Sequence, residues 1–167
     1  MLTREQFLDL CRNEVLIIKH LHTKVNPDNL NYRPTPGQRN TGEVLENLPC
    51  NLALIADCFI KSNFEGFKPV FEQIQASVKK DFSATMDAEM DKLAALVMAI
   101  PEAEFQNKEL VFPTGHKIKL GPGLVGSVYR FIVAYKMQLF LYLKAAGRTE
   151  LNSSNLWMGV DPQPKAK

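Results

Sequence analysis

The segment from Pro122 to Gly147 constrains the fold more than any other part of the chain, because it is apolar on almost every side. Pro122 suits the first position of a helix, where its missing N–H needs no partner, and Gly147 can end the helix in a left-handed conformation. The few polar residues inside the segment are Ser127, Arg130, Lys136, Gln138 and Lys144. Neighbours must cover a helix that is apolar around its circumference. The segment therefore predicts the central helix of a bundle, or a helix that also supports a subunit contact.

The same segment is long enough to span a membrane, for which about 20 apolar residues suffice. Arg130, Lys136 and Gln138 lie near its middle, however, and polar side chains there are costly in lipid. The whole chain, with 46% hydrophobic and 23% charged residues, has the composition of an ordinary globular protein. We therefore predict a buried helix and no membrane partner.

Size and charge narrow the classes of function. A chain of 167 residues suits one domain with its own core. The net charge is only +2 and the basic residues are spread along the chain, so we expect no nucleic-acid partner. The first residues lack a basic start followed by an apolar run, which predicts no signal peptide and a cytoplasmic protein. Cys11, Cys50 and Cys58 lack metal-type spacing and lie in apolar patterns, which predicts buried free thiols.

The first of three further helices is predicted to begin at Thr3. Thr3 and Gln6 have the types and spacing of a capping box, and apolar residues then follow at intervals of three and four. Asn26 and Pro27 should end this helix. Residues 26–40 contain three prolines and a glycine, so we expect an irregular connection that is long for a helical bundle.

The second predicted helix runs from Thr41 to about Asn63. Pro49 lies inside it and should kink it, because proline removes a backbone hydrogen bond. Residues 64–82 predict either a short helix or an irregular linker. The third helix covers about residues 83–100, with apolar side chains spaced for one buried face.

A change of period precedes the central helix. Residues 109–112 and 116–120 alternate around a Pro-Thr-Gly turn, which predicts a small β-hairpin. After the central helix, Leu151, Leu156 and Trp157 should fold back on the bundle. The predicted fold is therefore all-α: a four-helix bundle with a long first connection and a small hairpin before the last helix. We expect a single domain over residues 1–160 and a frayed tail over residues 161–167.

Two stretches resemble the DinB/YfiT-like superfamily. Residues 31–45, NYRPTPGQRNTGEVL, resemble the loop and second-helix start of that family, and residues 135–147 resemble the signature of its last helix. With the order of helices, the resemblance covers essentially the whole chain. It implies a DinB-like four-helix bundle, often a homodimer. Many members hold a divalent metal with three histidines at one end of the bundle, and some transfer thiol cofactors or isomerise their adducts.

The resemblance also locates the family's metal ligands, which are one histidine in the second helix and two at i and i+4 in the last helix. The i, i+4 spacing places both imidazoles on one face. These positions fall at Asn47, Phe131 and Tyr135. A phenyl ring cannot ligate, an asparagine offers a weak neutral oxygen, and a tyrosine would first have to lose its proton. We therefore expect that the family's divalent metal is absent and that no other cofactor is held.

The chain's own histidines do not predict a replacement site. His20 and His22 are about 200° apart around a helix, so both cannot converge on one ion, and at most one could join His116. His22 lies on the apolar stripe of the first helix, which fits a core histidine hydrogen-bonded to a neighbour or a functional one. Phe131 and Tyr135 are either core aromatics or the lining of a pocket with Asn47. The candidate pocket residues are Asn47, Phe131, Tyr135, His22, Tyr32, Arg33 and Gln138.

The surrounding polar residues also carry expectations. Arg33 and Arg39 should cap helix ends or pair with surface acids, and Gln138 should hydrogen-bond between helices. Trp157 should anchor the tail.

Three hypotheses of function follow. The first is a metal-free DinB-like homodimer that acts as a binding or interaction module, or as a degenerate relative of the enzymes. The alternative is a small-molecule, thiol-related transferase or hydrolase in which Tyr135 donates a proton and Asn47 contacts the substrate. The third is that the apolar surface of the last helix serves only subunit association. Whether the chain is an enzyme stays open.

Overall fold

The computed structural model describes residues 2–111 and 115–162. Within these ranges the chain is mainly helical with one small antiparallel hairpin, which confirms the all-α prediction. The helices are α1 (Arg4–His22), α2 (Pro27–Leu30), α3 (Thr41–Asn47), α4 (Ala53–Lys61), α5 (Phe67–Val78), α6 (Phe82–Met98), α7 (Glu102–Asn107), α8 (Leu120–Leu124) and α9 (Arg130–Ala145). Strands β1 (Glu109–Val111) and β2 (Lys117–Lys119) pair with Leu110 opposite Ile118.

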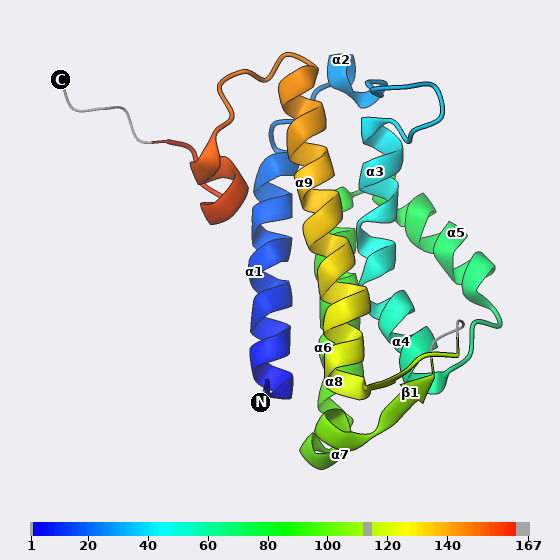
Figure 1. Cartoon of the computed structure of the whole chain (residues 1–167). Coiled ribbons are helices and arrows are strands. Elements are labelled where there is room, and N and C mark those ends of the chain that lie inside the picture. Colours follow the sequence, from blue (N-terminus) through cyan, green and yellow to red (C-terminus); the bar gives the residue numbers. More distant parts are fainter. Residues whose placement is uncertain (1, 112–114, 163–167) are drawn as a thin grey trace.

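The long helices enclose one main core. Helix α1 packs on α6 and α9, α3 packs on α9, and α4 packs on α6 (Figure 1). The core is built from fully buried aliphatic and aromatic side chains, among them Phe7, Ile18, Leu48, Met86, Leu93, Leu139 and Leu143. Helix α5 packs against α4 and α6. A smaller cluster of Cys50, Leu54, Cys58 and Ile74 joins it to α4 and to the turn before α4. Helix α7 and the hairpin close one end, where Phe105 and Leu110 are buried.

Helix α1 begins as predicted. The Thr3 hydroxyl accepts a hydrogen bond from the Gln6 N–H at 3.1 Å, and the Gln6 side chain accepts one from the Thr3 N–H at 3.0 Å. The predicted irregular connection after it is wrong for residues 27–30, which form α2. Asn26 and Asn29 make a second reciprocal box there, and Pro27 occupies the first helical position, where no N–H is needed.

Pro49 divides the predicted second helix instead of bending it. Helix α3 ends at Asn47, a 3₁₀ turn covers Pro49–Asn51, and α4 begins at Ala53. Pro49 has no N–H that could bond to the Leu45 carbonyl, and the Leu48 N–H bonds to this carbonyl instead, at 3.2 Å. Leu52 then leaves the helical region, with φ −93° and ψ −107°. For residues 64–82 the helical alternative is correct. Pro69 falls in the first turn of α5, where proline is tolerated.

The central helix begins earlier than predicted. It starts at Leu120, so Pro122 occupies the third helical position and not the first, and it passes through a π-helical segment (Val125–Tyr129) into α9. Its end is as predicted, because Gly147 has a left-handed φ of 104°. The N–H groups of Gly147 and Arg148 bond to the carbonyls of Lys144 and Leu143 in a Schellman motif.

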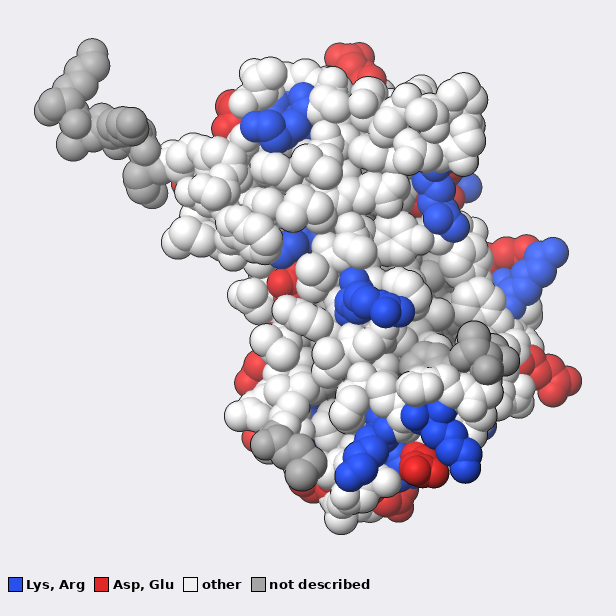
Figure 2. Space-filling view, viewed as in Figure 1, with Lys and Arg blue, Asp and Glu red and all other residues white. Residues whose placement is uncertain are grey.

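Among the described residues, this helix alone has the length and composition of a membrane span. Only 39% of its most apolar 18-residue window is buried within the chain. Figure 2 shows that the face formed by α1, α9 and the C-terminal segment is largely uncharged, with a few basic and acidic side chains among white atoms.

The C-terminal segment folds back on α1, as predicted. Leu151 and Leu156 are buried, and residues 154–158 form a π-helical turn that contacts α1. Trp157 anchors it only in part: the residue is 57% exposed, and its ring contacts Lys136 of α9, with Nζ 5.0 Å from the ring centre. Asp161, the first residue of the predicted frayed tail, is paired with Lys24 at 2.7 Å. Residues 163–167 lie outside the described part of the chain, as do Phe112 to Thr114 in the hairpin.

Candidate functional site

The loop between α2 and α3 contacts α9 at Tyr135. Arg39, near the end of that loop, donates a hydrogen bond to the Tyr135 hydroxyl oxygen at 3.2 Å, and its guanidinium carbon lies 6.0 Å from the ring centre. Asn40 caps α3 directly after Arg39 and fixes the point at which the loop becomes helix. The contact therefore follows from an exposed arginine being held at the start of α3, next to a half-buried tyrosine on α9.

Tyr32 and Gln138 meet on Tyr142, about two turns of α9 beyond Tyr135. The Tyr32 ring packs edge-on against the Tyr142 ring at 5.5 Å between centres. Gln138 donates to the Tyr142 hydroxyl oxygen at 2.7 Å. The expected hydrogen bond of Gln138 between helices is wrong, because its partner is one turn along the same helix.

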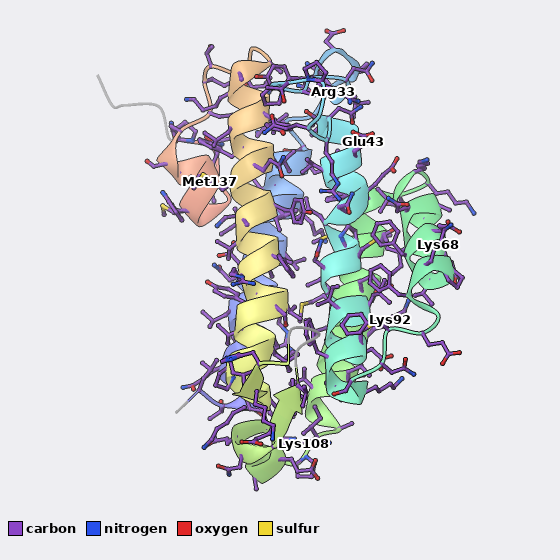
Figure 3. The ribbon with its side chains drawn as sticks, turned by 45° about the vertical axis from the view of Figure 1, so that its right-hand side comes forward. Arg33, Glu43, Lys68, Lys92, Lys108 and Met137 are labelled. Carbon is purple, nitrogen blue, oxygen red and sulfur yellow. The ribbon has the colours of Figure 1, made fainter. Side chains whose placement is uncertain are left out.

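Arg33 lies at the same end of the molecule, paired with Glu43 at the start of α3 (Figure 3). Its Nη2 is 3.5 Å from Glu43 Oε2, so the expected pairing with a surface acid is confirmed. Arg39 departs from that expectation, because its partner is the neutral Tyr135.

Asn47 and Phe131 have separate surroundings. The Asn47 amide donates to the Glu43 carbonyl at 2.7 Å, within its own helix, and the side chain is 8% exposed. The Arg130 guanidinium carbon lies 5.5 Å from the centre of the half-buried Phe131 ring. Neither residue lines any of the five cavities described for this chain. The structure thus brings Tyr32 and Gln138 together on Tyr142, places Tyr135 against Arg39, and gives Asn47 and Phe131 contacts of their own.

His22 belongs to a different surface. Its imidazole stacks on Phe82 at 4.3 Å between ring centres. It lines a cavity of about 460 Å³ between the ends of α1, α3, α5 and α6, together with Glu43, Glu46 and Lys79. Burial lowers the pKa of His22, and the nearby Asp81 carboxylate opposes this only in part. His22 is therefore neutral at pH 7.

The other histidines do not join it. His20 Nε2 lies 3.0 Å from the Asn155 amide nitrogen and 3.6 Å from Asp161, both of the C-terminal segment. His116 lies in the hairpin next to β2, at the other end of the chain's core. As expected from their spacing, His20 and His22 face different partners.

A buried ion pair joins α1 and α9. Lys136 of α9 and Glu14 of α1 lie 2.6 Å apart between Nζ and Oε2, with side chains 1% and 9% exposed. Glu14 Oε2 has no aligned hydrogen bond among the described residues, so the contact is ionic. The Trp157 ring covers the lysine at 5.0 Å from Nζ, which places a cation–π contact over the pair.

The Glu14 carboxylate of this pair adds to the effect of burial on the pKa of nearby groups. Burial, and then the Glu14 carboxylate, raise the pKa of Cys11 to about 12. Burial and the same carboxylate raise the pKa of the Tyr129 phenol. Burial also raises the pKa of Cys50 to about 12. Cys11 and Cys50 are thus protonated at neutral pH, and a protonated thiol is neither a nucleophile nor a metal ligand.

The positions of Glu14 and Lys136 in the sequence indicate this ion pair. Glu14 follows Cys11 by three residues and precedes Ile18 by four, so it stands on the apolar stripe of the first helix. Lys136 stands in the middle of the most apolar helix. A carboxylate and an ammonium at such positions satisfy each other when the two helices pack. Glu89 carries the same signal on α6, between Met86 and Leu93.

The side chains at Asn47, Phe131 and Tyr135 do not suit a divalent metal. The asparagine amide is bonded to its own helix, the phenyl ring has no lone pair, and the Arg39 cation lies against the tyrosine oxygen. Within residues 2–111 and 115–162, no three His, Cys, Asp or Glu side chains are grouped closely enough to hold a metal ion. Comparison with known proteins adds no identity: no family model matches the chain, and no curated protein matches it.

Proposed function

We propose that the chain is a DinB-like four-helix-bundle protein that self-associates into a homodimer and acts as a binding or interaction module. In this arrangement α1, α3 with α4, α6, and α8 with α9 are the four helices of the bundle. The observation that carries the proposal is the apolar helix Leu120–Ala145, of which only 39% of the most apolar 18-residue window is buried within one chain. A face of this kind on a water-soluble protein is typically an interaction surface.

Exposed apolar side chains on α9, on α1 and in the C-terminal segment support self-association. Leu141 on α9, Leu10 on α1 and Trp157 in the C-terminal segment are 54%, 40% and 57% exposed. Met137 lies on the side of α9 that faces the C-terminal segment (Figure 3). Two copies related by a two-fold axis would each cover the other's apolar face with the same residues, which is the common form of a homodimer.

The donor chemistry at Asn47, Phe131 and Tyr135 supports a binding role that does not use the family's metal. A divalent cation beside Tyr135 would be repelled by the Arg39 guanidinium. Asn47 offers such a cation only a neutral amide oxygen. We therefore derive no catalytic step through a metal.

Light scattering on the eluting protein tests self-association. We expect a particle of about twice the chain mass of 18.8 kDa. Leu141→Glu places a charge on the α9 face and should give a monomer. Met98→Glu is the matched control, because Met98 is 43% exposed on α6, outside this face, and should leave the dimer intact. A wild-type monomer at all concentrations would refute the proposal.

A second candidate is the transferase or hydrolase in which Tyr135 donates a proton. The favouring observation is that the Tyr135 hydroxyl oxygen accepts from Arg39, while no hydrogen bond uses its proton among the described residues. Screening thiol metabolites for a shift in melting temperature tests this. The candidate requires a shift that Tyr135→Phe abolishes and Tyr32→Phe keeps. A screen in which no thiol shifts the wild-type protein rejects it.

A further inference from the structure

A cavity of about 500 Å³ lies between α4, α5 and α6, away from the α9 face and from Tyr135. Its volume falls within the range of about 300–1,000 Å³ that is usual for small-molecule sites. Six of the nine lining residues are apolar: Ala53, Leu54, Val70, Ala95, Leu96 and Ala99. The three alanines leave the space that larger side chains would fill. The other three lining residues are Asp57, Glu89 and Lys92.

The charged residues of this cavity differ greatly in exposure. The Glu89 side chain is 4% exposed, whereas that of Lys92 is 64% exposed, and Glu89 Oε1 lies 2.6 Å from Lys92 Nζ. Lys92 extends from α6 beside α4, on the side that carries α5 (Figure 3). The carboxylate is therefore a fixed part of the wall, and the lysine is a partner that can move into water.

A second cavity, of about 290 Å³, adjoins the first along α5 and α6. The two share Val70, Glu89 and Lys92, so the ion pair stands between them. Withdrawal of Lys92 would expose the Glu89 carboxylate to both cavities. A ligand in the larger cavity would then have its polar end at Glu89 and its body among the alanines.

Charge decides which ligand fits. An anion on Lys92 would either share the ammonium with Glu89 or draw it away, and in both cases a second negative charge would stand beside the buried carboxylate. A cation would replace Lys92 on Glu89, so the buried carboxylate would stay paired, and the lysine, which is 64% exposed, would return to water. Asp57, on the opposite wall, adds a second negative charge, though Lys61 pairs with it at 2.7 Å. The cavity therefore favours a cation with an apolar body.

We propose that this cavity binds a small organic ammonium ion, whose N–H groups take the place of Lys92 on the Glu89 carboxylate and whose apolar body fills the space beside Ala53, Ala95 and Ala99. The site is independent of the self-association face. A failure of the proposed homodimer would not affect this proposal.

Three probes with one apolar body test the choice of charge: 1-adamantylammonium, 1-adamantanol and 1-adamantanecarboxylate. Titration calorimetry on the full chain at pH 7 measures each affinity. A charge-assisted hydrogen bond to a buried carboxylate should make the ammonium probe bind about tenfold more tightly than the alcohol. The carboxylate probe should bind most weakly. Equal affinities for the ammonium and the alcohol, or no binding of the ammonium at millimolar concentration, would overturn the proposal.

Substitutions test the roles of the two charged residues. Glu89→Gln should reduce the preference for ammonium over alcohol to about twofold or less, because the carboxylate is gone. Lys92→Gln removes the competing cation and should tighten ammonium binding severalfold, and a weaker affinity would contradict the exchange. Lys68→Gln is the control: Lys68 is 85% exposed on α5 and pairs with Glu72, so binding should not change.

Filling the cavity provides a further check that does not depend on charge. Ala95 is an exposed helical position that lines the cavity, so Ala95→Leu should be tolerated by the fold and should abolish binding of the ammonium and the alcohol alike. Unchanged binding by this variant would place the probes elsewhere and refute the site. Circular dichroism of each variant confirms that it is folded.

Discussion

Lys136 and Glu14 bring two opposite charges into the core at a contact between α1 and α9. Taking both from water is costly, and their attraction offsets this cost only while both are present. A buried pair of this kind adds little net stability, but removing one member strongly destabilises the fold because the other charge is left buried and unpaired. The aromatic face of Trp157 shields the lysine from water on the remaining side.

Lys136→Met should therefore lower the free energy of unfolding by about 3–5 kcal/mol, because it leaves the Glu14 carboxylate buried and unpaired. Replacing both partners, with Glu14→Leu and Lys136→Met together, should recover most of this loss. Urea unfolding followed by circular dichroism measures each value. For comparison, Lys61→Met breaks an exposed pair with Asp57 and should cost less than about 1 kcal/mol. A double variant no more stable than the single one would contradict this account.

At the scale of elements, the stability of the central helix depends on two glycines, one at its end and one in its interior. Gly147 ends it at φ 104°, a conformation that an L side chain rarely adopts. Gly126 lies inside the π-helical segment without a positive φ, and a Cβ built there meets nothing within 4 Å. The same substitution should therefore have opposite effects at the two positions.

Gly147→Ala should destabilise the protein by about 1 kcal/mol or more, because the left-handed end becomes strained. Gly126→Ala should stabilise it by about 0.4–1 kcal/mol, because alanine has fewer conformations in the unfolded chain. Melting temperatures of the two variants beside the wild type test this. Equal shifts for both variants would show that the helix end is not held as described.

The helix boundaries show where local patterns predict an element and where they do not. The capping residues Thr3 and Gln6 act over three residues, so the start of α1 was predictable from the pattern alone. The break after α3 was predicted only as a kink. A kinked helix and a 3₁₀ turn can both accommodate a proline that has no N–H. The packing of α4 on α6 decides which of the two forms at Pro49.

At the scale of the whole molecule, two histidines link stability to pH. His20 lies between α1 and the C-terminal segment, and burial and then Lys24 lower its pKa, against the opposing effect of Asp161. His22 lies against Phe82 and has its pKa lowered by burial. The unfolded chain takes up protons at these residues as the pH falls through about 6.5, while the folded chain stays neutral to lower pH.

The protein should therefore lose stability as the pH falls from 7.5 to 5.5, since protons bind first to the unfolded state. The double variant His20→Gln with His22→Phe should show a smaller difference between these two pH values. Phenylalanine keeps the stack on Phe82. Urea unfolding at both pH values measures the difference, and an unchanged difference in the double variant would assign the pH dependence to other groups.

The candidate site was predictable only in part. Tyr135 and Arg33 were singled out, and they do lie at one end of the molecule with contacts to a loop and to a helix start. His22 was singled out with them and lies on another surface. The Glu89 cavity was not foreseen, because a carboxylate on an apolar stripe reveals its partner only when neighbouring helices are placed.

The sequence by itself determined the long helices, the cap that begins α1, the hairpin and the central place of the apolar last helix, because these follow from apolar spacing and from contacts three or four residues apart. The tertiary structure alone decided three things: that Glu14 meets Lys136, that Arg39 reaches Tyr135, and that three alanines and Glu89 line one cavity. Each joins segments far apart in the chain. Such contacts depend on how whole helices rotate and pack against one another, which no local pattern specifies.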